Sequence, residues 1–254
     1  MNRLSELMVV SILLVLSGCT GGQSEGPLAS GGLTFSDPRL NTAIRQAIMK
    51  PTGAIFPPEV AGTQWFSAAR LDVSRLSGLR SLELLYLNNN DVEDVSPLSS
   101  LTSLVSLDLS GNDVRDVTAL GLLRDLELLY MNGNRIEDLA PFSGLASLKF
   151  LLLSSNRINN IGALTDLASL TTFYLSSNQI EDITALSQLT SLTYLSLFNN
   201  QVKDLTELVN NPGIGTFDTV VLTENPLSES AITIQIPALK ARRVTVIVTP
   251  TIDI

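Results

Sequence analysis

The sequence predicts an α/β solenoid, a right-handed superhelix of stacked repeats with a parallel β-sheet on its concave face. A helical cap is expected at the N-terminal end and a second cap at the C-terminal end. Two observations predict this fold: a short leucine pattern returns with a 22-residue period, and apolar columns between its copies keep the same period. A fixed period in the twenties is typical of solenoids, in which a single repeat cannot bury its apolar face and neighbours must stack.

The repeated unit spans nine positions and reads L-x-x-L-x-L-x-x-N. The stretch LELLYLNNN, which begins at Leu82, returns two periods later almost unchanged as LELLYMNGN, which begins at Leu126. The six regular copies end at Asn90, Asn112, Asn134, Asn156, Asn178 and Asn200. A seventh copy, FDTVVLTEN from Phe217 to Asn225, is displaced by three extra residues, which predicts a local bulge. The pattern resembles that of a leucine-rich repeat, and we expect the repeats to occupy residues 68–226.

The L-x-L segment of each copy predicts a short strand, because residues two apart lie on the same face of a strand. Its two leucines then point into the core, and the residues between and beside them point outward on the concave side. Further apolar residues recur two, five, eight, eleven and fourteen positions after Asn90, Asn112, Asn134, Asn156 and Asn178. These columns predict a continuous core that runs through all the repeats.

Two polar columns are interpreted as structural. An asparagine amide both donates and accepts, so each pattern asparagine can pair with backbone groups of its own turn and of the next turn. An acidic column follows and comprises Asp94, Asp116, Asp138, Asp182 and Asp204, interrupted by Asn160. Regularly spaced carboxylates of this kind could form a row of metal-binding sites. However, Ser or Thr stands two residues after most members of the column, and Pro or Ala often comes next. We therefore expect a capped helical turn on the convex side, with the hydroxyl residue as the cap.

Residues 1–18 have the layout of a signal peptide. A short polar start that contains Arg3 precedes an apolar run from Leu7 to Leu16, which is too short to span a bilayer comfortably. The run ends in LSGC, which resembles the lipobox of bacterial lipoproteins. In that family the peptide is cut before the cysteine, and the cysteine thiol carries a diacylglycerol. The alternative is a plain signal peptide with a chance cysteine.

The lipobox resemblance implies that residues 1–18 are removed and that Cys19 is lipidated and holds the protein on a membrane. Thr20 follows the cysteine in place of the aspartate that, in the sorting rule of Gram-negative lipoproteins, retains them at the inner membrane. We therefore expect a lipid-anchored protein of the bacterial cell envelope, at the outer membrane or the cell surface.

The rest of the chain is expected to connect and cap the repeats. Residues 19–34 are rich in Gly and Ser and predict a flexible tether. Residues 35–67 predict an N-terminal helical cap, and residues 227–254 a C-terminal cap made of a short helix and a final strand. Trp65 lies one period before Leu87, so we assign it to the core of a degenerate opening repeat.

Three segments together resemble one family: the cap FSDPRLNTAIRQAI, the 22-residue repeats and the closing NNPGIGTFDTVVLTENPLS. They are similar to bacterial surface leucine-rich repeat proteins of the internalin-like kind, over roughly residues 35–250. The resemblance implies a curved solenoid that binds a partner, usually a protein, on its concave face.

The composition argues against several functions. The 254 residues include 16 basic and 25 acidic side chains, and the sequence pI is about 4.5, whereas nucleic-acid binding requires basic patches. There is no histidine, which excludes Ser-His-Asp and Cys-His catalysis and ordinary His-based zinc sites. We therefore expect no cofactor, no metal, no nucleic-acid partner and no enzymatic activity. Cys19 is the only cysteine, so no intramolecular disulfide is possible.

All four tyrosines of the chain fall at predicted concave positions. Three of them share one column, two repeats and so roughly 10 Å apart. Together with their neighbours they make up the candidate partner-binding residues: Tyr86, Asp108, Leu128, Tyr130, Phe150, Leu152, Tyr174, Tyr194 and Phe198. Exposed aromatic residues with apolar neighbours favour an interaction surface, whereas the preference of aromatic residues for strands is the alternative explanation. Asp108 is the one charge among the concave positions, either simply solvated or an orienting contact.

These observations predict a cell-envelope lipoprotein whose concave face binds a partner, in the first place a protein. One alternative is a structural lipoprotein that assembles with neighbouring copies through the same tyrosines. Another is a glycan-binding adhesin, because aromatic rings stack on sugars.

Overall fold

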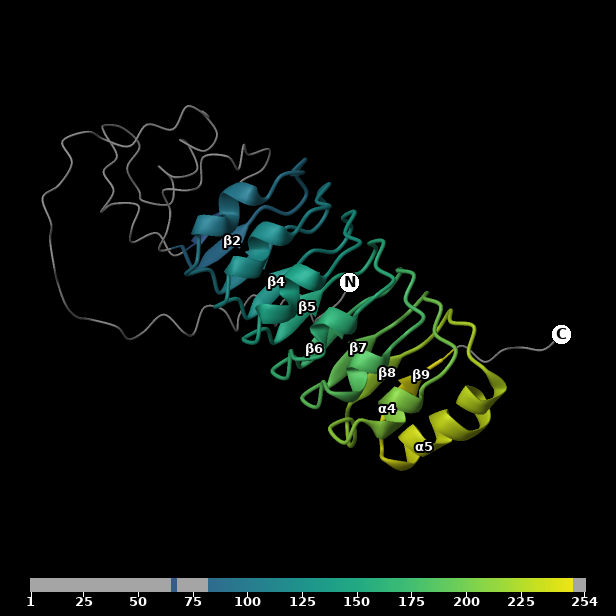
Figure 1. The fold of residues 1–254 in the computed structure, drawn as a ribbon. Helices are drawn as coiled ribbons and strands as arrows, with labels where there is room; N and C mark the ends of the chain where they lie inside the picture. The colour runs from purple at the N-terminus through teal and green to yellow at the C-terminus, as the bar shows by residue number, and fades with distance from the viewer. Residues whose placement is uncertain (1–64, 68–81, 249–254) are drawn as a thin grey trace, which may run out of the picture. The chain divides into compact units, whose positions relative to one another are not determined.

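A computed structural model of the chain describes residues 65–67 and 82–248, all within the second of the two units into which the chain divides, Leu33–Ile254. The described residues form one nine-stranded parallel sheet in chain order (Figure 1). Its strands are β1 (Trp65–Ser67), β2 (Leu84–Tyr86), β3 (Ser106–Asp108), β4 (Leu128–Tyr130), β5 (Phe150–Leu152), β6 (Thr172–Tyr174), β7 (Tyr194–Ser196), β8 (Thr219–Val221) and β9 (Thr245–Ile247). The predicted solenoid with a parallel sheet is confirmed.

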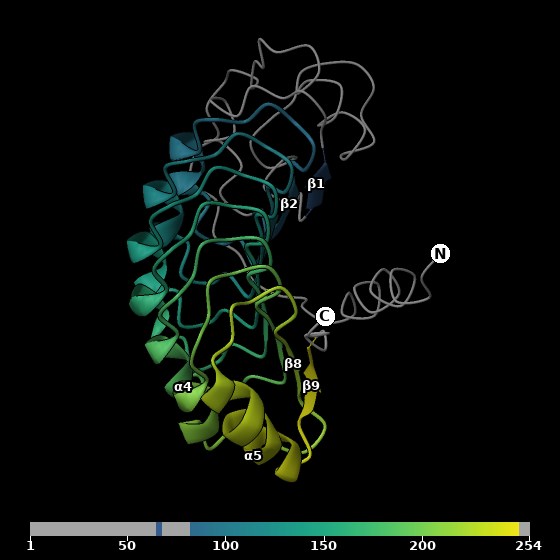
Figure 2. The same cartoon turned by 90° about the vertical axis from the view of Figure 1, so that its right-hand side faces the viewer.

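The strands lie on the concave side of the stack and short helices on its convex side (Figure 2). Within residues 82–248 the first five of these are 3-10 helices: η2 (Ser96–Ser100), η3 (Thr118–Leu122), η4 (Ala140–Gly144), η5 (Gly162–Leu164) and η6 (Thr184–Ser187). The sixth, α4 (Thr206–Asn210), is an α-helix. Hydrogen-bonded strands stack closely, at about 4.8 Å, whereas helical turns are wider. Because each repeat contributes one strand and one helical turn, the wider helical side lies on the outside of the curve.

The helical turns are capped by the acidic column and not by the hydroxyl residues, so the predicted cap is wrong. The Oδ1 atom of Asp94 accepts the backbone N–H of Ser96 at 2.8 Å, and the same Asx turn recurs at Asp116, Asp138, Asn160, Asp182 and Asp204. The residue between the two, Val95 in the first case, is apolar and 2% exposed because its side chain fills the core. The cap must therefore come from one residue earlier. Within the described ranges, no group of three His, Cys, Asp or Glu side chains could hold a metal ion.

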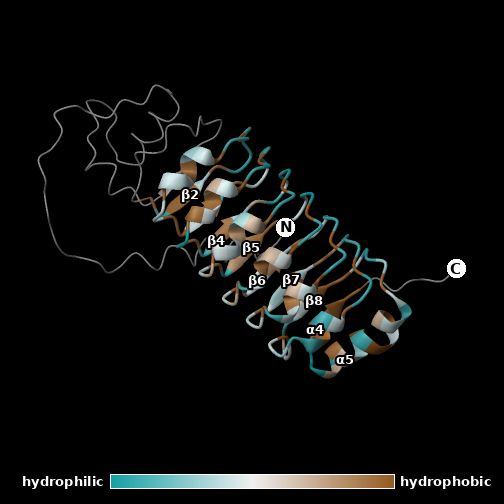
Figure 3. Ribbon diagram, in the orientation of Figure 1, coloured by the Kyte–Doolittle hydropathy of each residue, from teal (hydrophilic) through white to brown (hydrophobic). Residues whose placement is uncertain are grey.

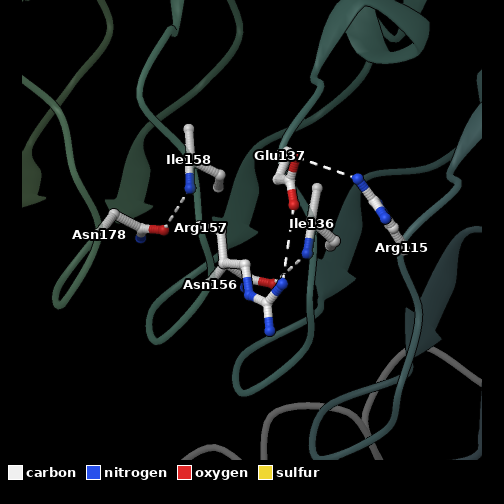
Figure 4. Close-up of polar contacts among 7 residues, drawn as sticks. All are labelled: Arg115, Ile136, Glu137, Asn156, Arg157, Ile158 and Asn178. Atoms are coloured by element: carbon white, nitrogen blue, oxygen red, sulfur yellow. Dashed lines mark hydrogen bonds and ion pairs between the residues drawn. The ribbon is translucent and has the colours of Figure 1, made fainter.

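The pattern asparagines join neighbouring turns below the end of each strand. The amide nitrogen of Asn134 donates to the carbonyl oxygens of Met131 in its own turn (3.1 Å) and of Leu109 in the preceding turn (2.9 Å). Its Oδ1 atom accepts the N–H of Val114 at 3.0 Å. Figure 4 shows the same link one repeat later, between Asn156 and Ile136. The predicted structural role is confirmed, but the bonds run to the preceding turn and not to the next one.

The seventh copy of the pattern departs from the predicted alignment. Ile214, one period after Leu192, is 1% exposed and takes the place of the first leucine, so the assignment of Phe217 to that core column is wrong. Phe217 is 89% exposed and has a positive φ of 74°. The three extra residues thus lie between the buried Ile214 and β8, where the N–H of Asp218 donates to the carbonyl oxygen of Gly215 at 3.2 Å. The predicted local bulge is confirmed.

The loop before this bulge packs tightly on the preceding repeat. A Cβ atom at Gly213 would collide with the backbone carbonyl of Thr190, so only glycine fits there. Asn211 is fully buried, and its amide nitrogen donates to the carbonyl oxygens of Leu186 (2.6 Å) and Leu189 (3.1 Å). The loop is therefore fixed by the repeat on which it lies.

A short helical segment and the last strand cover the final repeat, as predicted. The segment begins as a π-helix, η7 (Ala231–Gln235), continues as α5 (Ile236–Ala241) and leads into β9. The guanidinium of Arg242 donates to the carbonyl oxygens of Val209 (2.8 Å) and Asn211 (2.6 Å), which ties this cap to the preceding loop.

At the other end of the sheet, Trp65 pairs with Leu84 in parallel register, and Phe66 pairs with the buried Leu85. The spacing between these partners is shorter than one period, so the assumed match of Trp65 to Leu87 is wrong. The signal peptide, Cys19, the tether and the predicted cap helix lie outside the described residues. Their boundaries stay predictions.

Candidate binding face

The sheet presents three outward columns of residues, which we call the concave columns. The first column is Leu84, Ser106, Leu128, Phe150, Thr172, Tyr194 and Thr219, and the second is Tyr86, Asp108, Tyr130, Leu152, Tyr174, Ser196 and Val221. The third follows the strands and comprises Asn88, Ser110, Asn132, Ser154, Ser176, Phe198 and Thr223. Between them the inward residues of the strands are buried in the core. The structure thus separates the leucines that hold the fold from the side chains that face outward.

The predicted site residues all lie in these columns. Eight of them are partly exposed on strands β2 to β7, and Phe198, just after β7, is 38% exposed. Strands β4 to β7 bring six of them together as what we call the central patch: Leu128, Tyr130, Phe150, Leu152, Tyr174 and Tyr194. In Figure 3 strands β4 and β5 are coloured as hydrophobic. The patch is apolar and aromatic and carries no charged side chain.

Two rings of the central patch pack on one another. Thr172 pairs with Tyr194 in the sheet, so Tyr174, two residues further along β6, lies diagonally opposite Tyr194. The ring centroids are 4.7 Å apart at an interplanar angle of 25°, a stacked pair. Burial raises the pKa of Tyr174 to about 12, and the adjacent Tyr194 adds to the shift. The two rings therefore form one continuous aromatic surface.

Tyr130 is the second of the three tyrosines of the second column. Burial raises the pKa of its hydroxyl above the ordinary value, and the proximity of Tyr86 and Asp108 raises it further. The carboxylate of Asp108 accepts the backbone N–H of Ser110 at 2.9 Å, so it holds the end of its own strand. This structural contact was not among the roles predicted for Asp108, which is still partly exposed beside Tyr130.

Two predicted concave positions are covered by their neighbours. Ser106 is 1% exposed because it lies between Leu84 and Leu128, and Ser196 is 4% exposed next to Tyr174. The hydroxyl of Ser196 instead bonds that of Ser176, with 2.7 Å between the two oxygens. A partner can therefore contact the larger residues around these serines but not the serines themselves.

Charged side chains outside the concave columns pair with one another across neighbouring repeats. Glu137 contacts Arg115 at 3.3 Å and Arg157 at 3.8 Å (Figure 4). The other pairs are Asp113 with Arg135, Glu127 with Lys149, and Glu181 with Lys203. All these side chains are well exposed, so each pair contributes little to stability. Their charges are therefore already matched within the repeats.

Comparison with known proteins agrees with this architecture. A family model described as leucine-rich repeats (2 copies) matches residues 80–122 and 168–210. The crystal structure of internalin C2 from Listeria monocytogenes is 31% identical to the chain, with a TM-score of 0.73. The match covers 85% of this chain and 94% of that one. The chain belongs to the internalin-like leucine-rich repeat family.

Two further structures resemble this internalin-like chain. A second internalin of Listeria monocytogenes, inlF, is 26% identical with a TM-score of 0.65, covering 84% of this chain and 68% of that one. A leucine-rich repeat protein of Leptospira interrogans is 24% identical with a TM-score of 0.56, and the match covers 74% of this chain and 55% of that one. This likeness supports the fold alone. No curated protein sequence matches the chain. Within residues 82–248, no helix is long and apolar enough to cross a bilayer.

The internalin-like sheet also extends the outward columns beyond the predicted site. Ile247 of β9 pairs with Val221 and is 46% exposed, so it continues the second column past the last repeat. The prediction missed Ile247 because the asparagine pattern ends at Asn225 and no longer fixes the register. The alternation in TVI, with Val246 buried between two exposed residues, was the signal available for it.

Proposed function

We propose that the concave columns of this internalin-like protein bind a protein partner, with the central patch at the centre of the interface. The observation that carries the proposal is the patch itself, six apolar or aromatic side chains that are partly exposed and uncharged. Interface cores are depleted in charge, and tyrosine is a frequent hot-spot residue. Contiguous exposed apolar surface on a soluble domain marks an interaction site.

The sheet holds this patch in a fixed arrangement. Its side chains stand on strands whose backbone groups are paired on both sides, and the leucines beneath are buried. A surface that is ordered before binding loses little conformational entropy when a partner docks. Such a surface suits recognition of a folded or extended partner without rearrangement.

The same proposal places the protein in the bacterial cell envelope. The lipobox resemblance of LSGC supports lipidation of Cys19, and residues 19–34 would serve as the tether between lipid and repeats. Thr20 favours the outer membrane or the cell surface. A lipid anchor and a tether would present the concave columns to partners at the membrane surface.

The test is a double substitution in the central patch. Chemical cross-linking on cells that express the chain would identify the partner, and its affinity would then be measured for Tyr130→Ala/Tyr174→Ala. Each lost hot-spot ring is worth on the order of 2 kcal/mol or more, about 30-fold in affinity, so loss of both rings should weaken binding by about 4 kcal/mol, on the order of 1,000-fold. The rings are partly exposed, so circular dichroism should show an intact fold.

The matched control is Asp166→Ala/Ser169→Ala, two exposed residues outside the concave columns. We choose them over Arg115 and Glu137, which pair with one another and with Arg157. The control should leave binding unchanged. Loss of binding in the control pair with retention in the tyrosine pair would place the interface elsewhere.

A further inference from the structure

The second concave column has a regular alternation of large and smaller side chains. Along β2 to β7 it reads Tyr86, Asp108, Tyr130, Leu152, Tyr174 and Ser196, each paired in register with the next. A tyrosine therefore stands on every second strand. With neighbouring strands about 4.8 Å apart, successive tyrosines are spaced by about 9.6 Å along the stack, and the three span about 19.2 Å.

This spacing selects one peptide conformation among the three regular ones. A polyproline II helix has three residues per turn and a rise of about 3.1 Å, so it repeats every 9.3 Å or so and covers two tyrosine intervals with six residues, about 18.6 Å. A β-strand returns to the same face every 6.6–6.8 Å or so, which does not fit the interval. An α-helix needs seven residues, about 10.5 Å, and overshoots two intervals by about 1.8 Å.

The residues on either side of the second column suit the same ligand. The first column presents apolar side chains along β4, β5 and β7, namely Leu128, Phe150 and Tyr194. The third column presents the polar residues Asn132, Ser154 and Ser176, all partly exposed, although the hydroxyl of Ser176 also bonds that of Ser196. A polyproline II helix makes no internal hydrogen bonds, so its carbonyl oxygens require donors while its proline rings require aromatic contacts. The two sides of the column offer these two kinds of contact.

From this periodicity we infer that the second concave column binds a polyproline II segment of the partner, laid along the stack with one helical turn for each tyrosine interval. The inference rests on the proposed function, because it names the class of protein segment that the concave columns recognise. Proline rings stand between successive tyrosines, above Asp108 and Leu152. The preformed helix loses little conformational entropy on binding, which suits a rigid surface.

The experiment titrates the purified full-length chain with a fluorescent synthetic peptide that has proline at every third position. A scrambled peptide of the same composition, which lacks the three-residue period, is the ligand control. Binding of the periodic peptide should be the tighter of the two and should weaken about 30-fold in Tyr130→Ala.

A register-shift variant, Tyr130→Ala/Leu152→Tyr, tests the spacing itself. The variant keeps three tyrosines in the second column, on β2, β5 and β6. The first two are then three strands apart and the last two are one strand apart, whereas both intervals are two strands in the wild type. The periodic peptide should bind this variant as weakly as Tyr130→Ala. Recovery of wild-type affinity would mean that aromatic surface and not its spacing matters, and would overturn the inference.

The outcomes also separate this inference from the proposed function. Absence of peptide binding, equal binding of the scrambled peptide, or tyrosine-dependent binding of a β-1,4-linked oligosaccharide in its place would each overturn the polyproline II assignment. If the cross-linked partner needs Tyr130 and Tyr174 but the periodic peptide does not compete with it, the inference fails and the proposed function stands. If the partner binds the tyrosine double variant normally, the proposed function itself fails.

Discussion

Replacement of Asn134 by alanine should destabilise the solenoid in the middle of the array. The asparagine is 8% exposed and bridges two turns, and its amide makes bonds of 2.9–3.1 Å to three backbone groups and a longer one of 3.4 Å to the carbonyl oxygen of Asn132. Two of the three groups with short bonds keep another donor in the variant. The carbonyl oxygen of Leu109 still accepts from Asn112, and that of Met131 still accepts from Asn156. The N–H of the fully buried Val114 loses its bond to the asparagine Oδ1 atom.

The expected cost follows from these contacts. A buried N–H left without a partner costs about 1–3 kcal/mol, and the second bond lost at each carbonyl adds about 0.5 kcal/mol. The total is about 2–4 kcal/mol of unfolding free energy. For a domain of about 150–250 residues, 1 kcal/mol lowers the melting temperature by about 2–4 °C, so a decrease on the order of 4–16 °C is expected.

Thermal and urea unfolding of the full-length chain, followed by circular dichroism, would measure this cost. The neighbouring Arg135→Ala serves as the control, because it removes only an exposed ion pair with Asp113 and should change stability by less than about 1 kcal/mol. If Asn134→Ala unfolds like the control, the bridge between turns does not stabilise the stack and our account of the asparagine column is refuted.

Two further predictions rest on the structure and a third on the sequence. Gly213→Ala should destabilise the fold by about 1–3 kcal/mol or more, because its Cβ meets the backbone of the preceding repeat, whereas Gly215→Ala, whose Cβ would have 4.0 Å of room, should be nearly neutral in the same unfolding assay. In a spectrophotometric titration of tyrosinate, one transition should lie near pH 12 and should be absent in Tyr174→Phe. In Tyr194→Phe the same transition should move part of the way back towards pH 10. A Tyr194→Phe titration identical to wild type would contradict the proximity of the two hydroxyls. Cys19→Ser should leave the chain uncut and without lipid label, and a variant that still fractionates with membranes after normal processing would show that the lipobox interpretation is wrong.

The sequence predicted the fold well because one period governs every column of the core. Leu85, Leu107 and Leu129 occupy equivalent places, and so do the asparagines that join the turns. The prediction failed where the period breaks. Counting one period back from Leu87 gave the wrong match for Trp65, and counting the pattern forward put Phe217 in the core where Ile214 lies. The longer spacing before Asn225 shows that the repeat has three extra residues. It does not show at which position they are inserted.

The sequence predicted which residues of the candidate site face outward in each column. It did not predict which of them are exposed or which side chains contact one another. Outward positions follow from the alternation of the strand, whereas exposure also depends on the size of the residues on both neighbouring strands. Ser106 is buried for this reason. Tyr174 and Tyr194 stack in a diagonal contact between adjacent strands. Such a contact can be predicted only when the register of the two strands is known. The repeat period supplies that register only within the regular repeats.

Strand propensity alone does not account for the tyrosines. Aromatic residues favour strands on either face of a sheet, yet the inward positions of β4, β5, β6 and β7 hold Leu129, Leu151, Phe173 and Leu195, with one aromatic residue among four. The outward first and second columns of the same strands hold Tyr130, Phe150, Tyr174 and Tyr194 among eight positions. The core demands apolar residues, and the turns and helix starts demand Asn and Asp. Neither core packing nor the hydrogen bonds of the turns and helix starts constrain the residues of the concave columns in this way. Large exposed rings there are therefore not required for folding. The proposed partner binding would explain why rings rather than small polar residues occupy these columns.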